Sequence, residues 1–185
     1  MPDAFLPRLL VAIGLFFAAA NALLVVQLVR YARLRGSAVL TWRLPRPRFS
    51  TQFLLMAAAL ALVLVVKLVV ERRPPIEGFG ELMMFTYFGV LWPRSWGIER
   101  GFYEQGIWLD DGFLAYSQIG GLSWREGDGL TLLAIPRMKP LARRLAVPER
   151  HYGEARRLLR DRIKAHEIRY KGDLDLGGHD EREDV

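Results

Sequence analysis

The sequence contains no cysteine, which excludes disulfide bonds and thiolate metal sites. Its three histidines do not form the His-x-x-x-His or His-Glu-x-x-His patterns typical of zinc sites: His151, His166 and His179. Its glycine-rich stretches lack the Gly-Lys-Ser/Thr sequence of a phosphate-binding loop, and Asp110-Asp111-Gly112 is typical of a turn rather than of a catalytic carboxylate pair. We therefore expect no catalytic residue, no metal and no cofactor, and predict that the protein is not an enzyme.

Acidic residues are absent between Asp3 and Glu71, and two long apolar stretches lie in this region. Residues 9–29 are uncharged, and residues 53–70 contain one charged residue, Lys67. A helix that crosses the hydrocarbon core of a bilayer needs about 20 mostly apolar residues. The first stretch has this length, and the second has it if Lys67 snorkels to the interface. Because the first stretch is longer than the core of a cleaved signal peptide, we expect it to be retained. The sequence predicts an integral membrane protein.

Positive charge is concentrated in the same half of the chain. Residues 1–93 contain 10 Lys and Arg against 4 Asp and Glu, whereas residues 94–185 contain 16 of each, so the net charge of +6 belongs to the membrane half. Arginine that flanks apolar spans is typical of membrane proteins, and we expect no nucleic-acid partner. The loop between the two stretches, residues 30–50, carries six arginines and no acid: Arg30, Arg33, Arg35, Arg43, Arg46 and Arg48. By the positive-inside rule this loop is cytoplasmic and the N-terminus lies outside.

A third apolar stretch, residues 78–92, leaves two arrangements open. Its 15 residues span about 22 Å as a helix, which is short for a crossing. An interfacial or re-entrant helix would leave the C-terminal half outside, whereas a short third crossing would return it to the cytoplasm; we favour the crossing. Small and polar residues in these stretches predict a helix–helix contact, within the chain or with another protein: Gly14, Ala18, Asn21, Ala22, Gln27 and Glu81.

From Ile98 the pattern changes to short apolar segments separated by turn residues. These segments predict antiparallel strands at residues 98–103, 106–109, 112–116, 119–124, 129–135 and 141–147. After Pro148, apolar residues recur at helical spacing, which predicts one amphipathic C-terminal helix. We therefore expect a membrane domain at 1–93, a small α+β domain at 94–168, and a flexible acidic tail at 169–185 that is too polar to order itself.

The order of a strand meander and one closing helix resembles a pleckstrin-homology-like (PH-like) module, a curved antiparallel sheet or barrel closed by a C-terminal helix. More narrowly, the chain resembles a family of uncharacterised bacterial membrane proteins with two or three N-terminal spans and such a C-terminal domain. The residues that carry this resemblance are Tyr103-Glu104-Gln105-Gly106-Ile107, Tyr116 with Ile119, Leu122-Ser123-Trp124, Leu130-Thr131-Leu132, and Val147-Pro148 with Leu158-Leu159. The resemblance implies a cytoplasmic domain without catalytic residues, which supports the third crossing.

A basic cluster in the second half is the candidate ligand site: Arg137, Lys139, Arg143 and Arg144. No acid occurs between Asp128 and Glu149, so the cluster is suited to anionic lipid headgroups. A solvated strand and loop that offset the acids elsewhere is the simpler interpretation, and we favour it. The sequence predicts an accessory or scaffold subunit of the bacterial inner membrane, which packs its PH-like domain on a larger complex of integral membrane proteins. The alternative is a membrane-anchored sensor that binds lipid headgroups or another ligand through the basic cluster.

Overall fold

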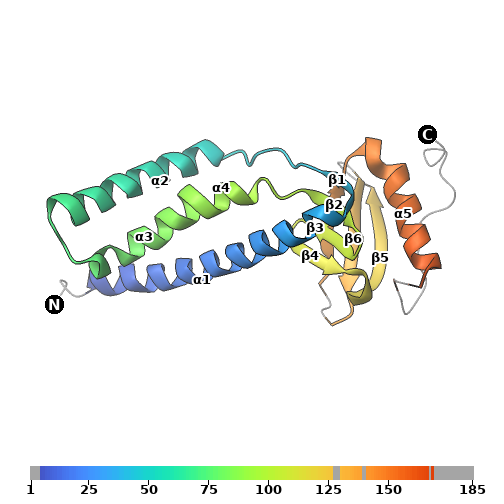
Figure 1. Ribbon diagram of the computed structural model, residues 1–185, viewed down its shortest axis with the longest axis horizontal. Coiled ribbons are helices and arrows are strands. Elements are labelled where there is room, and N and C mark those ends of the chain that lie inside the picture. Colours follow the sequence, from blue (N-terminus) through green and yellow to red (C-terminus); the bar gives the residue numbers. More distant parts are fainter. Residues whose placement is uncertain (1–4, 127–129, 139–140, 167, 169–185) are drawn as a thin grey trace. The chain divides into compact units, whose positions relative to one another are not determined.

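The computed structural model describes residues 5–126, 130–138, 141–166 and 168 (Figure 1). The acidic tail expected from residue 169 and Lys139 of the basic cluster lie outside these described residues. The chain divides into two compact units, Met1–Arg33 with Leu44–Ile98, and Leu34–Arg43 with Glu99–Val185. The second unit is therefore built from two separate pieces of the chain. This differs from the division expected from composition, which kept residues 34–43 with the membrane half.

The first unit is helical, because its sequence is apolar and rich in Leu, Ala and Val. Helix α1 (Phe5–Leu34) is followed, after the segment that belongs to the second unit, by α2 (Ser50–Val65), which continues as the π-helical η2 (Val66–Val70). The stretches Arg8–Ser37 and Ser50–Val70 are long and apolar enough to cross a membrane. They contain the two apolar stretches predicted from the sequence.

The third apolar stretch is also helical, and it is longer than its apolar core. It begins after Pro74 with η3 (Pro75–Gly78) and continues through α3 (Phe79–Phe85), η4 (Thr86–Leu91) and α4 (Trp92–Ser95). Pro75 suits the first turn because the missing N–H would have no partner there. The helical segment therefore spans residues 75–95, and at 1.5 Å per residue it is about 30 Å long.

Close glycine contacts pack the third segment against α1 and α2. A side chain at Gly80 would lie 2.5 Å from the carbonyl oxygen of Leu10, so the two backbones approach each other only because residue 80 is glycine. On the other side, Phe53 of α2 stacks on Phe88 with 5.3 Å between ring centroids. The third helical segment therefore packs between α1 and α2 (Figure 1).

Among its described residues, the second unit contains two antiparallel sheets and the α-helix α5 (Tyr152–Lys164). The first sheet has the order β1-β2-β3-β4, and the second has the order β5-β6-β7. Their strands are β1 (Ala38–Trp42), β2 (Arg100–Tyr103), β3 (Gly106–Leu109), β4 (Gly112–Ala115), β5 (Ile119–Glu126), β6 (Leu130–Pro136) and β7 (Arg143–Val147). A short 3-10 turn, η5 (Tyr116–Gln118), links the two sheets. The six strands from β2 on lie where the sequence predicts them, and the mixture of helix and antiparallel strand confirms the α+β class.

The two sheets do not close into a barrel, so that part of the prediction is wrong. Single hydrogen bonds connect the two sheets: the backbone amide of Asp110 donates to the carbonyl of Arg144 over 2.9 Å, and the side-chain indole N–H of Trp42 donates to the carbonyl of Ala146 over 3.1 Å. No continuous ladder joins β4 to β5 within the described residues, because η5 turns the chain between them.

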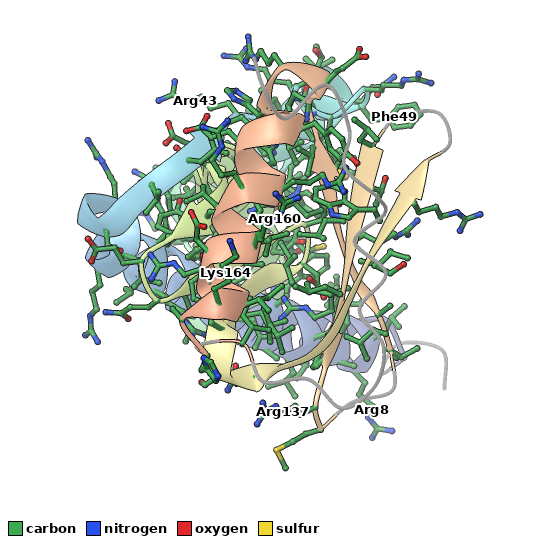
Figure 2. All side chains as sticks on the ribbon, turned by 90° about the vertical axis from the view of Figure 1, so that its right-hand side faces the viewer. Arg8, Arg43, Phe49, Arg137, Arg160 and Lys164 are labelled. Atoms are coloured by element: carbon green, nitrogen blue, oxygen red, sulfur yellow. The ribbon has the colours of Figure 1, made fainter. Side chains whose placement is uncertain are left out.

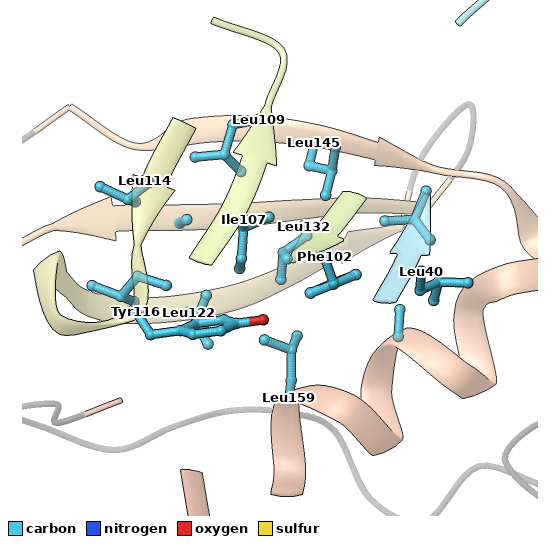
Figure 3. Close-up of a cluster of buried hydrophobic side chains, with 14 of the residues drawn as sticks. Leu40, Phe102, Ile107, Leu109, Leu114, Tyr116, Leu122, Leu132, Leu145 and Leu159 are labelled. Carbon is cyan, nitrogen blue, oxygen red and sulfur yellow. The ribbon is translucent and has the colours of Figure 1, made fainter. Parts of the chain in front are cut away.

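The space between the sheets is filled by an apolar core that helix α5 (Tyr152–Lys164) covers (Figure 3). The helix begins after Pro148 and the 3-10 turn η6 (Glu149–His151), as the proline and the helical spacing predict. Its residues Ala155 and Leu159 are fully buried. The core combines side chains from all seven strands and the helix, among them Leu40, Phe102, Ile107, Leu114, Leu122, Leu132, Leu145 and Leu159.

Candidate functional site

In the helical unit, an ion pair joins two helical segments. Lys67 of η2 contacts the carboxylate of Glu81 of α3, and Glu81 is 6% exposed. The sequence predicts that Lys67 snorkels and that Glu81 takes part in a helix–helix contact. In the structure Glu81 meets Lys67 of a neighbouring helical segment, and each charge compensates the other. Since an uncompensated charge is costly in an apolar setting, the pair also links η2 to α3.

A second polar contact joins α1 to the third segment. The side-chain amide of Asn21, which is 7% exposed, donates to the carbonyl of Met83 over 3.0 Å. Gly14 is buried against Phe79. Ala18 and Gln27 are half-buried, whereas Ala22 is exposed and lies away from this contact. Gly14, Asn21 and Glu81, which the sequence offered as contacts within the chain or with another protein, are therefore engaged inside the chain.

The outward surface of the helical unit is apolar. Large side chains of α1, α2 and η2 are exposed, among them Phe16, Leu23, Val26, Leu55, Leu62, Val69 and Val70. A water-soluble monomer rarely exposes a continuous apolar surface larger than a few hundred Å². This exposure is what a bilayer would cover.

The basic cluster of the second unit is split by the geometry of β7. Neighbouring residues of a strand point to opposite faces, so Arg143 and Arg144 cannot act together on one ligand. The guanidinium of Arg143 binds the carboxylate of Asp111, with Nε donating over 2.7 and 2.8 Å, and also donates to the carbonyl of Phe113 over 3.3 Å. Arg137 donates from Nε to the carbonyl of Ile119 over 3.2 Å. Arg137 lies apart from the basic residues Arg160 and Lys164 of α5 (Figure 2).

A pocket of about 660 Å³ brings Arg137 and Arg143 together. Its wall also contains Asp111, Ser117 and Gln118. Arg144 is not part of this wall. The pocket combines a hollow with charged side chains of three described residues, Asp111, Arg137 and Arg143.

Arg100 of β2 and Asp110, which follows β3, are neighbours: Nη2 of Arg100 donates to the backbone carbonyl of Asp110 over 3.2 Å. Burial raises the pKa of the Asp110 carboxyl, while Arg100 and the amide of Ala146 oppose the shift. Burial likewise lowers the pKa of Arg100, and Asp110 opposes that shift. These shifts follow from partial desolvation beside the sheet contact. Asp110 and Asp111 occupy the predicted turn between β3 and β4, and the described residues contain no cluster of three metal-binding side chains.

No family model, curated protein or solved structure matches this chain. Sequence reasoning found Arg137 and Arg143 from the absence of acids around them. It missed Ser117 and Gln118, which reach the pocket through the turn between the sheets. It also missed β1, although Leu40 and Trp42 alternate with Val39 and Thr41 in the way that marks a half-buried strand.

Proposed function

We propose that this chain is a non-catalytic integral membrane protein, with three crossings, that holds an α+β domain at one membrane surface. The pairing of β1 with β2 carries this proposal. Strand β1 lies between the two candidate spans, and β2 follows the third helical segment; Thr41 pairs with Gly101 and Trp42 with Arg100. Glu99 adds side-chain bonds to Thr41 and Arg43 over 3.1 and 3.0 Å. Paired strands lie on one side of a bilayer, so the chain between them crosses an even number of times.

Since Ser50–Val70 supplies one of these crossings, residues 75–95 supply the other. Their helical length of about 30 Å suits the hydrocarbon core. The Glu81 charge inside this segment is compensated by Lys67 of the preceding span. The arginines of residues 30–50 place the shared side in the cytoplasm, with the N-terminus outside. The membrane is the bacterial inner membrane, and the two-sheet domain with one closing helix supports the resemblance to a PH-like module.

Labelling of single cysteines tests this arrangement, because the natural chain has none. Leu44→Cys shows on which side of the membrane the loop between the two candidate spans lies. Glu77→Cys does the same for the turn before the third segment, and Glu154→Cys for the exposed face of α5. All three positions are exposed. A membrane-impermeant maleimide should reach Glu77→Cys from the periplasmic side, and Leu44→Cys and Glu154→Cys only in inverted vesicles. Labelling of Leu44→Cys and Glu154→Cys from opposite sides would overturn the proposal.

We assign the protein the role of an accessory or scaffold subunit. The apolar outer surface of the helical unit can pack against other integral membrane proteins, which supports this role. The full chain can be solubilised in mild detergent and purified by a C-terminal affinity tag. We expect other membrane proteins to purify with it in fixed stoichiometry. Native mass measurement checks this, and a mass equal to one chain plus detergent and lipid would contradict the subunit role.

A further inference from the structure

Helix α5 contains a buried arginine. Arg156 is only 4% exposed, and Tyr152, one turn earlier, is 3% exposed. Nη1 of Arg156 donates to the Tyr152 hydroxyl over 3.3 Å, and the guanidinium carbon lies 5.5 Å from the centre of the Tyr152 ring. These two contacts are made with uncharged groups, whereas a guanidinium removed from water is stable only beside a carboxylate. The burial of Arg156 therefore requires an acidic group close to this side of α5.

The acids of α5 itself lie on other sides of the helix. They are Glu154 and Asp161, and both are exposed. These residues are two and five positions from Arg156, whereas side chains on one helix face are three or four positions apart. The helix as a whole is basic, because its five basic and two acidic residues give a net charge of +3. An acidic segment that lies along α5 would therefore meet a charge of opposite sign.

The sequence that follows α5 has the required charge. Residues 169–185 contain six acidic and three basic residues, which gives a net charge of −3. The first two acids, Asp173 and Asp175, alternate with Leu174 and Leu176. In an extended chain, alternate side chains point to opposite sides, so both carboxylates would face one way and both leucines the other. Residues 173–176 thus combine a charged side with an apolar one.

The chain enters this segment from the core of the second unit. Ile168 is 2% exposed and belongs to the core cluster, and His166 before it has φ +59°, a conformation typical of the end of a helix. Asp173 and Asp175 are five and seven residues beyond Ile168, so an extended chain places them up to about 17 and 24 Å from it. The eight residues of α5 that follow Arg156 are about 12 Å long. Both carboxylates are therefore within reach of Arg156.

We propose that the acidic tail docks on the side of α5 that carries Arg156. Asp173 and Asp175 supply the counter-charges for Arg156 and for Arg160, which is one turn further along the same face. The leucines between them lie toward Trp124, whose ring meets that of Tyr152 at 4.9 Å between centroids and packs against the core. This contact gives the tail the partner surface that its own composition lacks.

The tail is favoured over an acidic segment of another protein because it is part of the same chain. A short covalent connection gives an effective concentration of about millimolar, so weak charged contacts suffice to hold the segment. Helix α5 and residues 169–185 also belong to the same unit. The proposal is therefore independent of the membrane arrangement.

A distance measurement in the full-length protein tests the docking. The natural chain has no cysteine, so spin labels can be attached at Glu154→Cys on the exposed face of α5 and at Gly178→Cys in the tail. Pulsed electron paramagnetic resonance of the detergent-solubilised protein should give one narrow distribution of distances between the labels. A broad distribution in this otherwise natural chain would overturn the proposal.

Charge variants of the tail show which acids hold it. Asp173→Asn with Asp175→Asn should broaden the distribution, because the carboxylates at Arg156 are lost. Glu183→Gln with Asp184→Asn removes the same number of charges beyond the label; it is the matched control and should keep the distribution narrow. A distribution that stays narrow in the first variant, or that broadens equally in both, would contradict the assigned contact.

Thermal unfolding followed by tryptophan fluorescence gives an independent readout. Arg156→Gln removes one side of the contact, and a chain that ends at residue 170 removes the other. Each should lower the unfolding temperature by about 4–8 °C, as expected when a small domain loses one charged contact. The two changes together should lower it no further than either alone, because they remove the same interaction. Arg125→Gln, at an exposed arginine of β5, should leave it unchanged.

The shortened chain keeps the test decisive if Arg156→Gln fails to fold. Losses that add when the two changes are combined, or an unfolding temperature that the shortened chain retains in full, would overturn the proposal.

Discussion

At the scale of single residues, the pair formed by Lys67 and Glu81 explains how an apolar unit accommodates two charges. Glu81 is buried and Lys67 is mostly buried, and each belongs to a different helical segment. Neither residue alone suits the interior of a membrane unit. Their contact converts two unfavourable residues into a specific link between η2 and α3.

Removing one partner should therefore be more harmful than removing both. Lys67→Met leaves the carboxylate of Glu81 buried without its counter-charge, and we expect a loss of about 3–5 kcal/mol in the free energy of unfolding. The double variant Lys67→Met with Glu81→Leu should recover most of this loss, as should the exchange Lys67→Glu with Glu81→Lys. Unfolding of the detergent-solubilised protein by added denaturing detergent measures the effect.

Lys164→Met provides the matched control, because Lys164 is an exposed lysine on a helix. It should leave the free energy of unfolding nearly unchanged. If Lys67→Met were as mild as Lys164→Met, the contact with Glu81 would have no role in holding the segments together.

At the scale of elements, β1 determines how the second unit is built. Its residues Leu40 and Trp42 are 7% and 4% exposed and belong to the core of a domain whose other strands begin almost 60 residues later. Strand pairing is possible because Gly101 has φ +129° and no side chain; a Cβ there would collide with the carbonyl oxygen of Leu40. The edge strand of the first sheet is therefore supplied by the loop between the two helices that are long and apolar enough to cross a membrane.

A fragment of residues 94–185 should consequently fold poorly. It lacks Leu40 and Trp42, and loss of large core side chains costs about 2–5 kcal/mol each, which is comparable with the whole stability of a small domain. The same fragment with residues 34–43 joined to residue 99 by a linker of about four glycine and serine residues should regain a cooperative unfolding transition. The linker can be short because Arg43 and Glu99 form an ion pair of 3.0 Å.

Circular dichroism during thermal unfolding compares the two fragments. A third fragment that carries Leu40→Ser and Trp42→Ser in the joined segment separates the contribution of the core side chains from that of added chain length. Equal melting of the joined fragment and the fragment without β1 would show that the strand is dispensable.

At the scale of the whole molecule, the chain alternates between its two units. It forms α1, adds a strand to the second unit, returns to form the remaining helical segments, and then completes the second unit. Composition separates an apolar half from a mixed half but cannot detect a five-residue strand inside an arginine-rich loop. The alternation gives the proposed membrane arrangement its physical basis, since the two pieces of the second unit must share one side.

The sequence by itself determined the two long apolar helices, the six strands from β2 on, the turn at Asp110-Asp111 and the C-terminal helix, because periodicity and turn chemistry are local properties. Tertiary structure alone decided that Glu81 meets Lys67, that Arg143 is held by Asp111 while Arg144 points elsewhere, and that Arg137 shares a pocket with Ser117 and Gln118. It also decided that the sheets remain separate and that β1 joins β2. These features depend on contacts between residues far apart in the chain, whose partners no local pattern specifies.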